Sequence, residues 1–202
     1  DTVLSRGLGD VYKRQGRSRL AQKPTPIRSS HAHLLCEQPM KKLILMRHAK
    51  SDWSSAGTSD HDRPLNPRGQ KAALAIGTWL KQQPIVPDQV LCSTATRCRQ
   101  TWDSVAEGLG TTIKPAFDPR LYLAEPATMA RLLHAATGEI VMMIAHNPGS
   151  ADLAEALCQT PPDDMDFYRY PTGAVTLIEF AIDHWSDLKP GTCRAFTTPR
   201  RL

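Results

Sequence analysis

Two arginines and two histidines stand where apolar segments of this chain end. Arg47 and His48 directly follow one such segment. Arg97 comes shortly after a second segment, and His146 directly follows a third. A guanidinium holds an anionic phosphoryl group through paired N–H donors, and an imidazole beside it can attack the phosphorus atom. These residue types therefore indicate phosphoryl chemistry, provided that the fold brings them to one place.

The three apolar segments have the character of strands that are buried on both faces. They are residues 41–46, 88–92 and 139–145. Short continuous apolar runs of this kind are typical of parallel sheets that helices cover on both sides. In an open α/β sheet, ligands bind beside the carboxyl ends of the strands. We therefore expect the strand ends to deliver their arginines and histidines to one edge of one sheet.

Helical patterns alternate with these strands along the chain. We expect helices over residues 67–82, 94–108, 126–136 and 148–158, and further strands near 112–117, 174–181 and 194–198. Ser93 or Thr94 is predicted to cap the second helix. That cap places Arg97 in the first turn, where free backbone N–H groups also favour anions. The alternation predicts an α/β protein, a three-layer αβα sandwich with a mostly parallel central sheet.

Ordered motifs in residues 40–202 resemble those of the histidine phosphatase superfamily. They are Leu-Met-Arg-His-Ala at 45–49, Ser-x-x-x-Arg followed by Gln-Thr at 93–101, and Ala-His-Asn-Pro-Gly at 145–149. The segments 47–53, 60–69 and 170–174 narrow the resemblance to the small SixA-type phosphohistidine phosphatases. The resemblance implies a phosphoglycerate mutase-like fold. Ala49 departs mildly from the glycine that often follows the catalytic histidine in the superfamily.

The resemblance also implies a two-step displacement at His48. The imidazole attacks phosphorus to form a covalent phosphohistidine, which water then hydrolyses. His48 must be neutral for this step, with one ring nitrogen free and the other donating to a nearby backbone carbonyl. Arg47, Arg97 and His146 are expected to contact the phosphoryl oxygens and stabilise the transferring group.

Arg63 and Asn147 are further candidates for substrate binding. Arg63 belongs to an Asp-x-Arg-Pro-Leu segment, where it either contacts phosphate or forms a surface ion pair with Asp60 or Asp62. Asn147 directly follows the second histidine of the proposed site. Residues 51–62 are polar, and we expect them to form a loop over this site.

The identity of a general acid stays open. Superfamily members that act on phosphate monoesters commonly use a carboxylate to protonate the departing alkoxide, and the candidates here are Glu125, Asp52 and Asp62. A phosphohistidine substrate relaxes this requirement, because imidazole is a better leaving group than an alkoxide and protonates near neutral pH. Weak provision for an acid therefore favours a phosphohistidine substrate.

We therefore predict a metal-independent phosphatase that needs no cofactor and removes phosphate from phosphohistidine in proteins, such as a histidine phosphotransfer domain. The segment between Arg97 and His146 is too short for a large cap, which suits an open site. The alternatives are a phosphatase or mutase of small phosphate monoesters, and a non-catalytic phosphoprotein-binding module. A cysteine-dependent phosphatase is disfavoured, since Cys92 and Arg97 form Cys-x4-Arg where that class has Cys-x5-Arg.

Composition sets wider bounds on partners and location. A chain of 202 residues with 41% hydrophobic content suits one domain with a substantial core. Most of the net charge of +5 falls in residues 1–39. The rest of the chain is close to neutral, so its composition does not indicate a broad nucleic-acid-binding surface. No apolar run approaches the ~20 residues of a membrane span. The 5 cysteines are odd in number and form no Cys-x-x-Cys pair, which favours reduced thiols and a cytoplasmic location.

Residues 1–39 differ in character from the rest of the chain. They show no hydrophobic periodicity and no apolar core of secretory-signal length. We predict that they form a disordered, non-native leader. The histidine phosphatase domain is then expected over residues 40–202, with Met40 as the natural start.

Overall fold

A six-stranded sheet organises residues 40–54 and 57–202, which are the residues that the computed structural model describes. The strands are β1 (Met40–Arg47), β2 (Gln89–Ser93), β3 (Ala116–Asp118), β4 (Ile140–Ala145), β5 (Val175–Ala181) and β6 (Thr192–Thr197). Their order across the sheet is β3-β2-β4-β1-β5-β6. The pairs β3–β2, β2–β4 and β4–β1 are parallel, whereas β5 runs antiparallel to both β1 and β6. The predicted mostly parallel sheet is confirmed.

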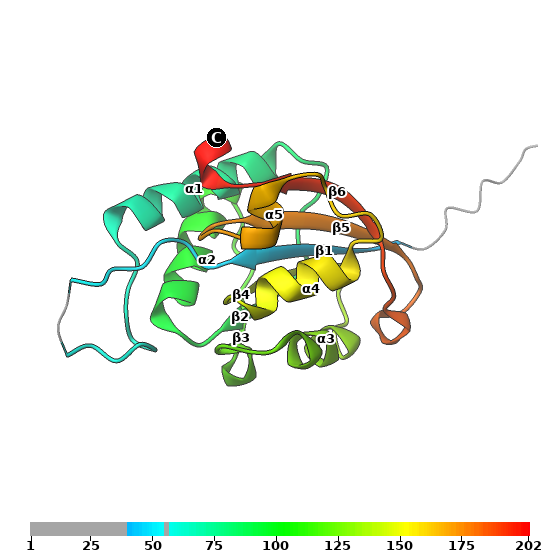
Figure 1. The fold of residues 1–202 in the computed structure, drawn as a ribbon, viewed down its shortest axis with the longest axis horizontal. Coiled ribbons are helices and arrows are strands. Elements are labelled where there is room, and N and C mark those ends of the chain that lie inside the picture. The colour runs from blue at the N-terminus through cyan, green and yellow to red at the C-terminus, as the bar shows by residue number, and fades with distance from the viewer. Residues whose placement is uncertain (1–39, 55–56) are drawn as a thin grey trace, which may run out of the picture. The chain divides into compact units, whose positions relative to one another are not determined.

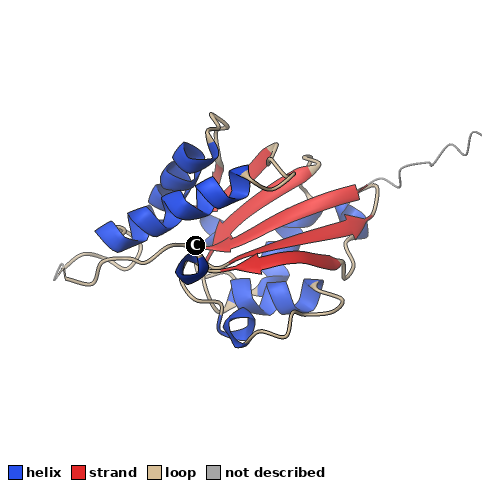
Figure 2. Ribbon diagram, turned by 90° about the horizontal axis from the view of Figure 1, so that it is seen from above, coloured by secondary structure: helices blue, strands red, loops and turns tan. Residues whose placement is uncertain are grey.

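Helices cover both faces of this sheet, as Figures 1 and 2 show. They are α1 (Pro67–Lys81), α2 (Thr96–Leu109), α3 (Pro126–His134), α4 (Gly149–Leu157) and α5 (Met165–Arg169). Three short 3-10 helices span Pro119–Leu121, Trp185–Asp187 and Pro199–Arg201. The apolar sides of α1 and α2 pack in one hydrophobic cluster, and those of α3, α4 and α5 pack in the other. The predicted three-layer α/β sandwich is confirmed.

The central strand β1 shows why the chain folds into these layers. Its residues Leu43, Ile44, Leu45 and Met46 are all fully buried. Successive side chains of a strand point to opposite faces, so Leu43 and Leu45 enter one cluster while Ile44 and Met46 enter the other. A continuous apolar run is therefore required here, because an alternating pattern would leave one layer without a core.

The register between β1 and β4 sets the strand ends level with each other. Arg47 pairs with Ala145 in the parallel ladder. The backbone N–H of His48 then donates to the carbonyl oxygen of Ala145 at 3.0 Å. Because both strands stop at this level, His48 and His146 leave the sheet side by side.

Some local predictions differ from the structure. Helix α2 has Ala95 as its N-cap, without a side-chain cap, so the predicted cap by Ser93 or Thr94 is wrong. The hydroxyl of Ser93 bonds to a histidine ring and that of Thr94 bonds to His61, and these tertiary contacts outweigh the local preference for capping. The expected strand near 112–117 is confined to β3, and the short helix α5 was not predicted.

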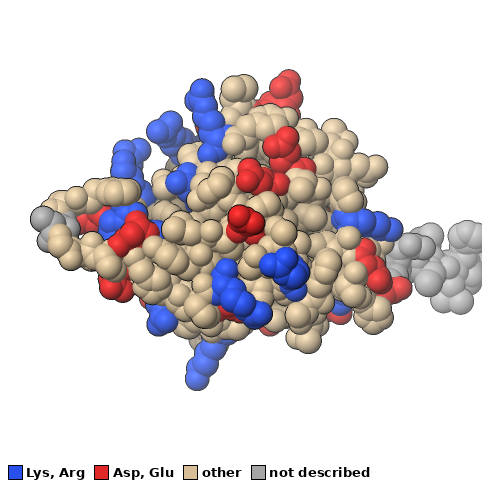
Figure 3. Space-filling view, turned by 60° about the horizontal axis from the view of Figure 1, so that its bottom comes forward, with Lys and Arg blue, Asp and Glu red and all other residues tan. Residues whose placement is uncertain are grey.

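Other predictions concern residues 1–39, membrane-spanning segments and nucleic-acid binding. The predicted leader, residues 1–39, lies outside the described residues. Within the described parts of the chain, every helix is too short or too polar to cross a bilayer. On the face that Figure 3 shows, acidic and basic side chains are interspersed. That face therefore lacks the continuous basic surface that nucleic-acid binding uses.

Candidate active site

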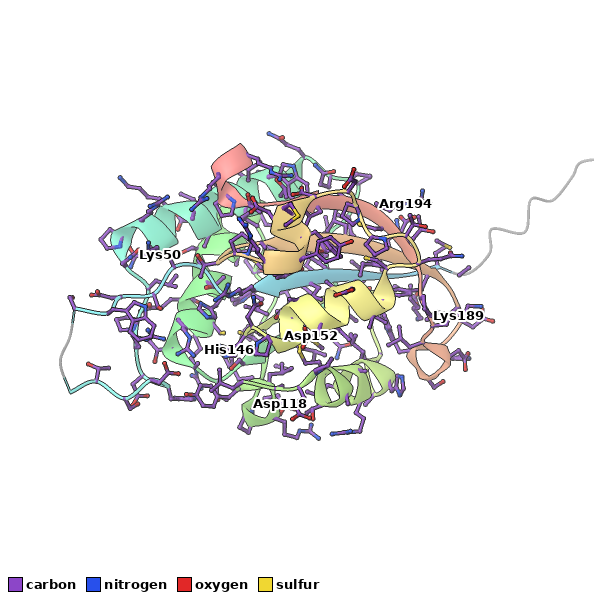
Figure 4. All side chains as sticks on the ribbon, viewed as in Figure 1. Lys50, Asp118, His146, Asp152, Lys189 and Arg194 are labelled. Atoms are coloured by element: carbon purple, nitrogen blue, oxygen red, sulfur yellow. The ribbon has the colours of Figure 1, made fainter. Side chains whose placement is uncertain are left out.

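The two histidines and Arg97 meet at the carboxyl end of the parallel strands. The rings of His48 and His146 have their centroids 5.1 Å apart. Arg97 lies in the first turn of α2, and its Nε donates to Nε2 of His48 at 3.3 Å. One of its terminal nitrogens lies 3.2 Å from Nδ1 of His146. Figure 4 places His146 and Lys50 toward the same end of the sheet, away from Lys189.

The hydrogen bonds of His48 fix its tautomer. Its Nδ1 lies 2.8 Å from the carbonyl oxygen of Ala49, so Nδ1 carries the proton and Nε2 keeps its lone pair. The pKa of His48 is lowered from 6.5 to about 3, mainly by burial and also by the nearby charges of Arg97, Arg47 and Arg63, while the bond to Ala49 opposes the shift. His48 is therefore a neutral imidazole at neutral pH, with an unprotonated Nε2 that accepts from Arg97.

His146 is held in the complementary tautomer. Its Nε2 lies 2.8 Å from the hydroxyl of Ser93, and its Nδ1 accepts from Arg97. The pKa of His146 is lowered to about 3, mainly by burial and also by the neighbouring His48 and Arg97. The ring is therefore neutral at neutral pH. Ser93, which we expected to cap a helix, instead orients this histidine.

Arg47 and Arg63 carry N–H groups that have no partner among the described residues. Arg47 donates one terminal N–H to the carbonyl oxygen of Tyr170 at 2.8 Å, while its Nε is buried and unpaired. Arg63 bonds to Asp60 at 2.8 Å, while its Nε and one terminal nitrogen are buried and unpaired. The guanidinium of Arg63 stacks on the ring of Trp53, with its central carbon 3.3 Å from the ring centroid. Buried donors without acceptors are costly, and an anion would satisfy them.

Asp60 is a site residue that the sequence suggested only as an ion-pair partner. Its carboxylate accepts from Arg97 at 2.9 Å, from Tyr122 at 2.7 Å and from Arg63 at 2.8 Å. The hydrogen bond from Tyr122 and the charges of Arg97 and Arg63 lower the pKa of Asp60. Asp60 is therefore ionised. Its position three residues before Arg63 in the quoted motif is the signal that could have identified it.

These residues line a pocket of about 530 Å³. Arg47, His48, Arg97 and His146 all lie on its wall, together with Arg63 and Asn147. Both hydrogens of the Asn147 amide bond to backbone carbonyls at 3.1 Å, which leaves only its oxygen free, so its direct part in substrate binding stays a prediction.

The three suggested general acids are not among the residues that line the pocket. Asp52 bonds to Ser54, Asp62 bonds to Ser59, and Glu125 precedes α3. Asp60 is the one carboxylate among the described residues that line the pocket.

The cysteines near the site are not arranged as nucleophiles. Cys92 and Cys98 are fully buried, and burial raises the pKa of both thiols. A thiol that stays protonated is a poor nucleophile. Within the described ranges, no group of three or more His, Cys, Asp or Glu residues could hold a metal ion.

Comparisons with known proteins show which sequences this chain is similar to. Residues 43–122 match the family model described as histidine phosphatase superfamily, branch 1. An uncharacterized protein of Mycobacterium tuberculosis is 35% identical over 165 residues, which cover 77% of this chain and 100% of that protein.

Solved structures are also similar to this chain. A SixA protein from Nakamurella multipartitia superposes with a TM-score of 0.69 at 25% identity, covering 79% of this chain and 96% of that one. The protein histidine phosphatase SixA complexed with tungstate superposes with a TM-score of 0.66 at 25% identity, covering 79% of this chain and 98% of that one.

Proposed function

Because this chain belongs to the histidine phosphatase superfamily and is of its SixA type, we propose that it removes phosphoryl groups from phosphohistidine side chains of proteins. The reaction proceeds through a covalent phosphohistidine on His48. The observation that carries this proposal is the neutral His48 imidazole, with its Nδ1 proton on a backbone carbonyl and its Nε2 facing Arg97.

The first step transfers the phosphoryl group to the enzyme. Nε2 of His48 attacks phosphorus, a new N–P bond forms, and the P–N bond to the substrate imidazole breaks. The substrate ring, protonated on its other nitrogen, leaves as neutral imidazole. Arg97 and the unpaired N–H groups of Arg47 and Arg63 bind the phosphoryl oxygens, where fixed positive charge stabilises the transition state.

The second step hydrolyses the enzyme intermediate. Water attacks phosphorus, and His48 leaves as a neutral imidazole because its Nδ1 proton stays hydrogen-bonded to Ala49. The ionised Asp60 carboxylate lines the pocket, so we assign it to accept the proton of the attacking water. Ser93 and Tyr122 position His146 and Asp60 for these steps.

The state of Asp60 favours phosphohistidine over phosphate monoesters. A monoester releases an alkoxide, which needs a protonated acid beside the leaving oxygen. Asp60 has a lowered pKa and is ionised at neutral pH, so it does not supply the proton that an alkoxide needs. A departing imidazole has no such need, since it leaves neutral. A tetrahedral oxyanion, tungstate, is also the ligand of one SixA relative.

The proposal also covers the metal requirement of the reaction and the compartment in which the protein acts. The chemistry uses only side chains of the chain, so activity is expected without added metal. Four described cysteines are unpaired, which supports a reducing, cytoplasmic setting. The partner expected for a phosphohistidine phosphatase is a phosphorylated protein.

The test compares kcat/KM for a phosphohistidine-bearing phosphotransfer domain with kcat/KM for sugar phosphates, in buffer containing a metal chelator. We expect the protein substrate to be preferred by about 100-fold or more, the loss that an absent acid costs an alkoxide leaving group. A preference for sugar phosphates would overturn the substrate class while leaving the family assignment intact.

A further inference from the structure

A second hollow lies beside the catalytic pocket. It has a volume of about 90 Å³, and its wall includes Lys50, Arg68, Thr198 and Arg200. Lys50 and the turn at 171–172 belong to the walls of both hollows. The second hollow therefore adjoins the site of chemistry, and the mechanism above leaves it unused.

The cations of this hollow differ from the surface arginines that the fold pairs with carboxylates. Arg120, Arg194 and Arg201 each form an ion pair with a carboxylate at 2.5–2.6 Å. Lys50, Arg68 and Arg200, in contrast, form no ion pair within the described parts of the chain. No acidic residue is among the described residues of this wall. Three uncompensated positive charges around one small hollow favour an anion.

A buried hydroxyl gives an independent sign of a missing ligand. Thr198 is 1% exposed, lies on the wall of the hollow, and its Oγ1 has no hydrogen-bond partner among the described residues. A buried hydroxyl without a partner costs free energy, and an anion oxygen in the hollow would accept its hydrogen bond.

The hollow is fixed relative to the nucleophile. The backbone N–H of Gly173 donates to the carbonyl oxygen of His48 at 3.0 Å. Gly173 has φ +80°, and a Cβ at this position would lie 2.6 Å from Pro199, so the turn packs closely on the segment that carries Thr198 and Arg200. A ligand held in the hollow would keep a set position relative to His48.

We propose that this hollow is an accessory anion site, which binds a second anionic group of the substrate while the phosphoryl group faces His48. This inference rests on the proposed function. In a protein substrate, the group is the carboxylate of an Asp or Glu near the phosphohistidine; in a small substrate, it is a second phosphate. The accessory site thus selects doubly anionic substrates.

Matched substrates test this site. Phosphohistidine peptides with Glu neighbours are compared with the same peptides carrying Gln, and a hexose bisphosphate is compared with the hexose monophosphate. We expect wild-type kcat/KM to favour the Glu peptide about 10-fold, mostly through KM, because one added charge contact contributes about 1.4 kcal/mol. In the Arg68→Gln/Arg200→Gln variant the ratio should fall toward 1, with the Gln peptide hydrolysed as in wild type.

Two further variants separate a bound group from a general charge effect. Lys189→Gln removes the same kind of charge toward the other end of the sheet (Figure 4) and should leave the ratio unchanged. Thr198→Val should lower the Glu-to-Gln ratio of kcat/KM about 3-fold without lowering the melting temperature. Thr198→Ser should restore this ratio.

The outcomes are distinct. An unchanged ratio in the double variant, or an equal loss in Lys189→Gln, overturns the accessory site. If the enzyme hydrolyses only the sugar phosphates, the phosphohistidine assignment fails, and the bisphosphate ratio then decides the accessory site by the same criterion.

Discussion

The two ends of strand β1 both carry basic residues, but among the described residues only those at the amino end form direct salt bridges with carboxylates. At the amino end, Lys41 pairs with Glu139 at 2.7 Å and Lys42 pairs with Glu179 at 3.0 Å. At the carboxyl end, Arg47 faces Arg97 and two neutral histidines, and burial together with Arg97 lowers the pKa of Arg47. The positive charge at the amino end is neutralised by carboxylates of the fold, whereas the positive charge at the carboxyl end can bind an anion.

This difference indicates where the chain gives up stability for function. Burying like charges together costs free energy that an ion pair would avoid. Asp60 offsets part of that cost by bonding to Arg97, but the unpaired N–H groups of Arg47 and Arg63 remain. A bound phosphoryl group supplies the missing negative charge. The comparison therefore predicts that variants at the two ends behave differently.

The largest effect is expected at His48. His48→Ala should lower kcat by about 10⁴-fold or more, because it removes the imidazole that attacks phosphorus. Steady-state hydrolysis of a phosphohistidine protein measures this loss. Cys92→Ser is the matched control, and full retention of its activity is expected; activity that depends on Cys92 and survives in His48→Ala would overturn the mechanism.

Arg97→Gln should lower kcat/KM by about 10²–10³-fold, since it removes charge-assisted hydrogen bonds to the transferring group. Kinetics on the same substrate measure the change. A loss of less than 5-fold would show that Arg97 does not contact the phosphoryl group in the transition state.

Oxyanion binding should stabilise the carboxyl-end cluster. Tungstate at about 100 times its Kd is expected to add about 2.7 kcal/mol, which corresponds to roughly 5–10 °C in melting temperature for a domain of this size. The shift should vanish in Arg97→Gln and persist in Lys41→Gln. An equal shift in both variants would place the oxyanion elsewhere.

The two buried histidines should also make stability depend on pH. Their pKa values are about 3 in the folded state, against 6.5 as the ordinary value. Between pH 6.5 and 3 the unfolded chain binds more protons, so stability is present above pH 6.5 and is lost as pH falls through this window. The limiting slope is about 1.4 kcal/mol per pH unit for each histidine.

Urea unfolding at several pH values measures this slope. His146→Gln should make it shallower, whereas His134→Gln, an exposed histidine on α3, should leave it unchanged. Equal slopes in wild type and His146→Gln would show that His146 is not buried as a neutral ring.

The smallest effect is expected at the amino end. Lys41→Gln should leave kcat/KM unchanged and lower the free energy of unfolding by at most about 1 kcal/mol, because the partner carboxylate of Glu139 is 66% exposed. Chemical denaturation and kinetics check both points. A clear loss of activity would mean that the two ends are not functionally separate.

The sequence predicts the carboxyl end well because strong, local patterns specify it. Apolar runs fix β1, β2 and β4 as buried strands, and parallel pairing then sets Arg47 level with Ala145, directly before His146. Arg97 follows from its place after β2. Each of these features depends on which residues are buried and on their order along the chain, and both can be predicted from the sequence.

The residues that orient this cluster are harder to predict, because their roles come from tertiary contacts. Ser93 has the type of a helix cap, yet its hydroxyl lies 2.8 Å from His146. Tyr122 stacks edge-on against His146, with ring centroids 5.4 Å apart, and donates to Asp60 from a segment far along the chain. No local periodicity reports such contacts.

The most direct test of the central claim is to trap the enzyme intermediate. The enzyme is mixed with a phosphohistidine protein, quenched in alkali within milliseconds, digested and mapped by mass spectrometry. The account predicts an acid-labile phosphoryl group on His48 that is absent from His48→Ala. Turnover with the phosphoryl group on another residue, or with no phosphoenzyme under single-turnover conditions, would contradict it.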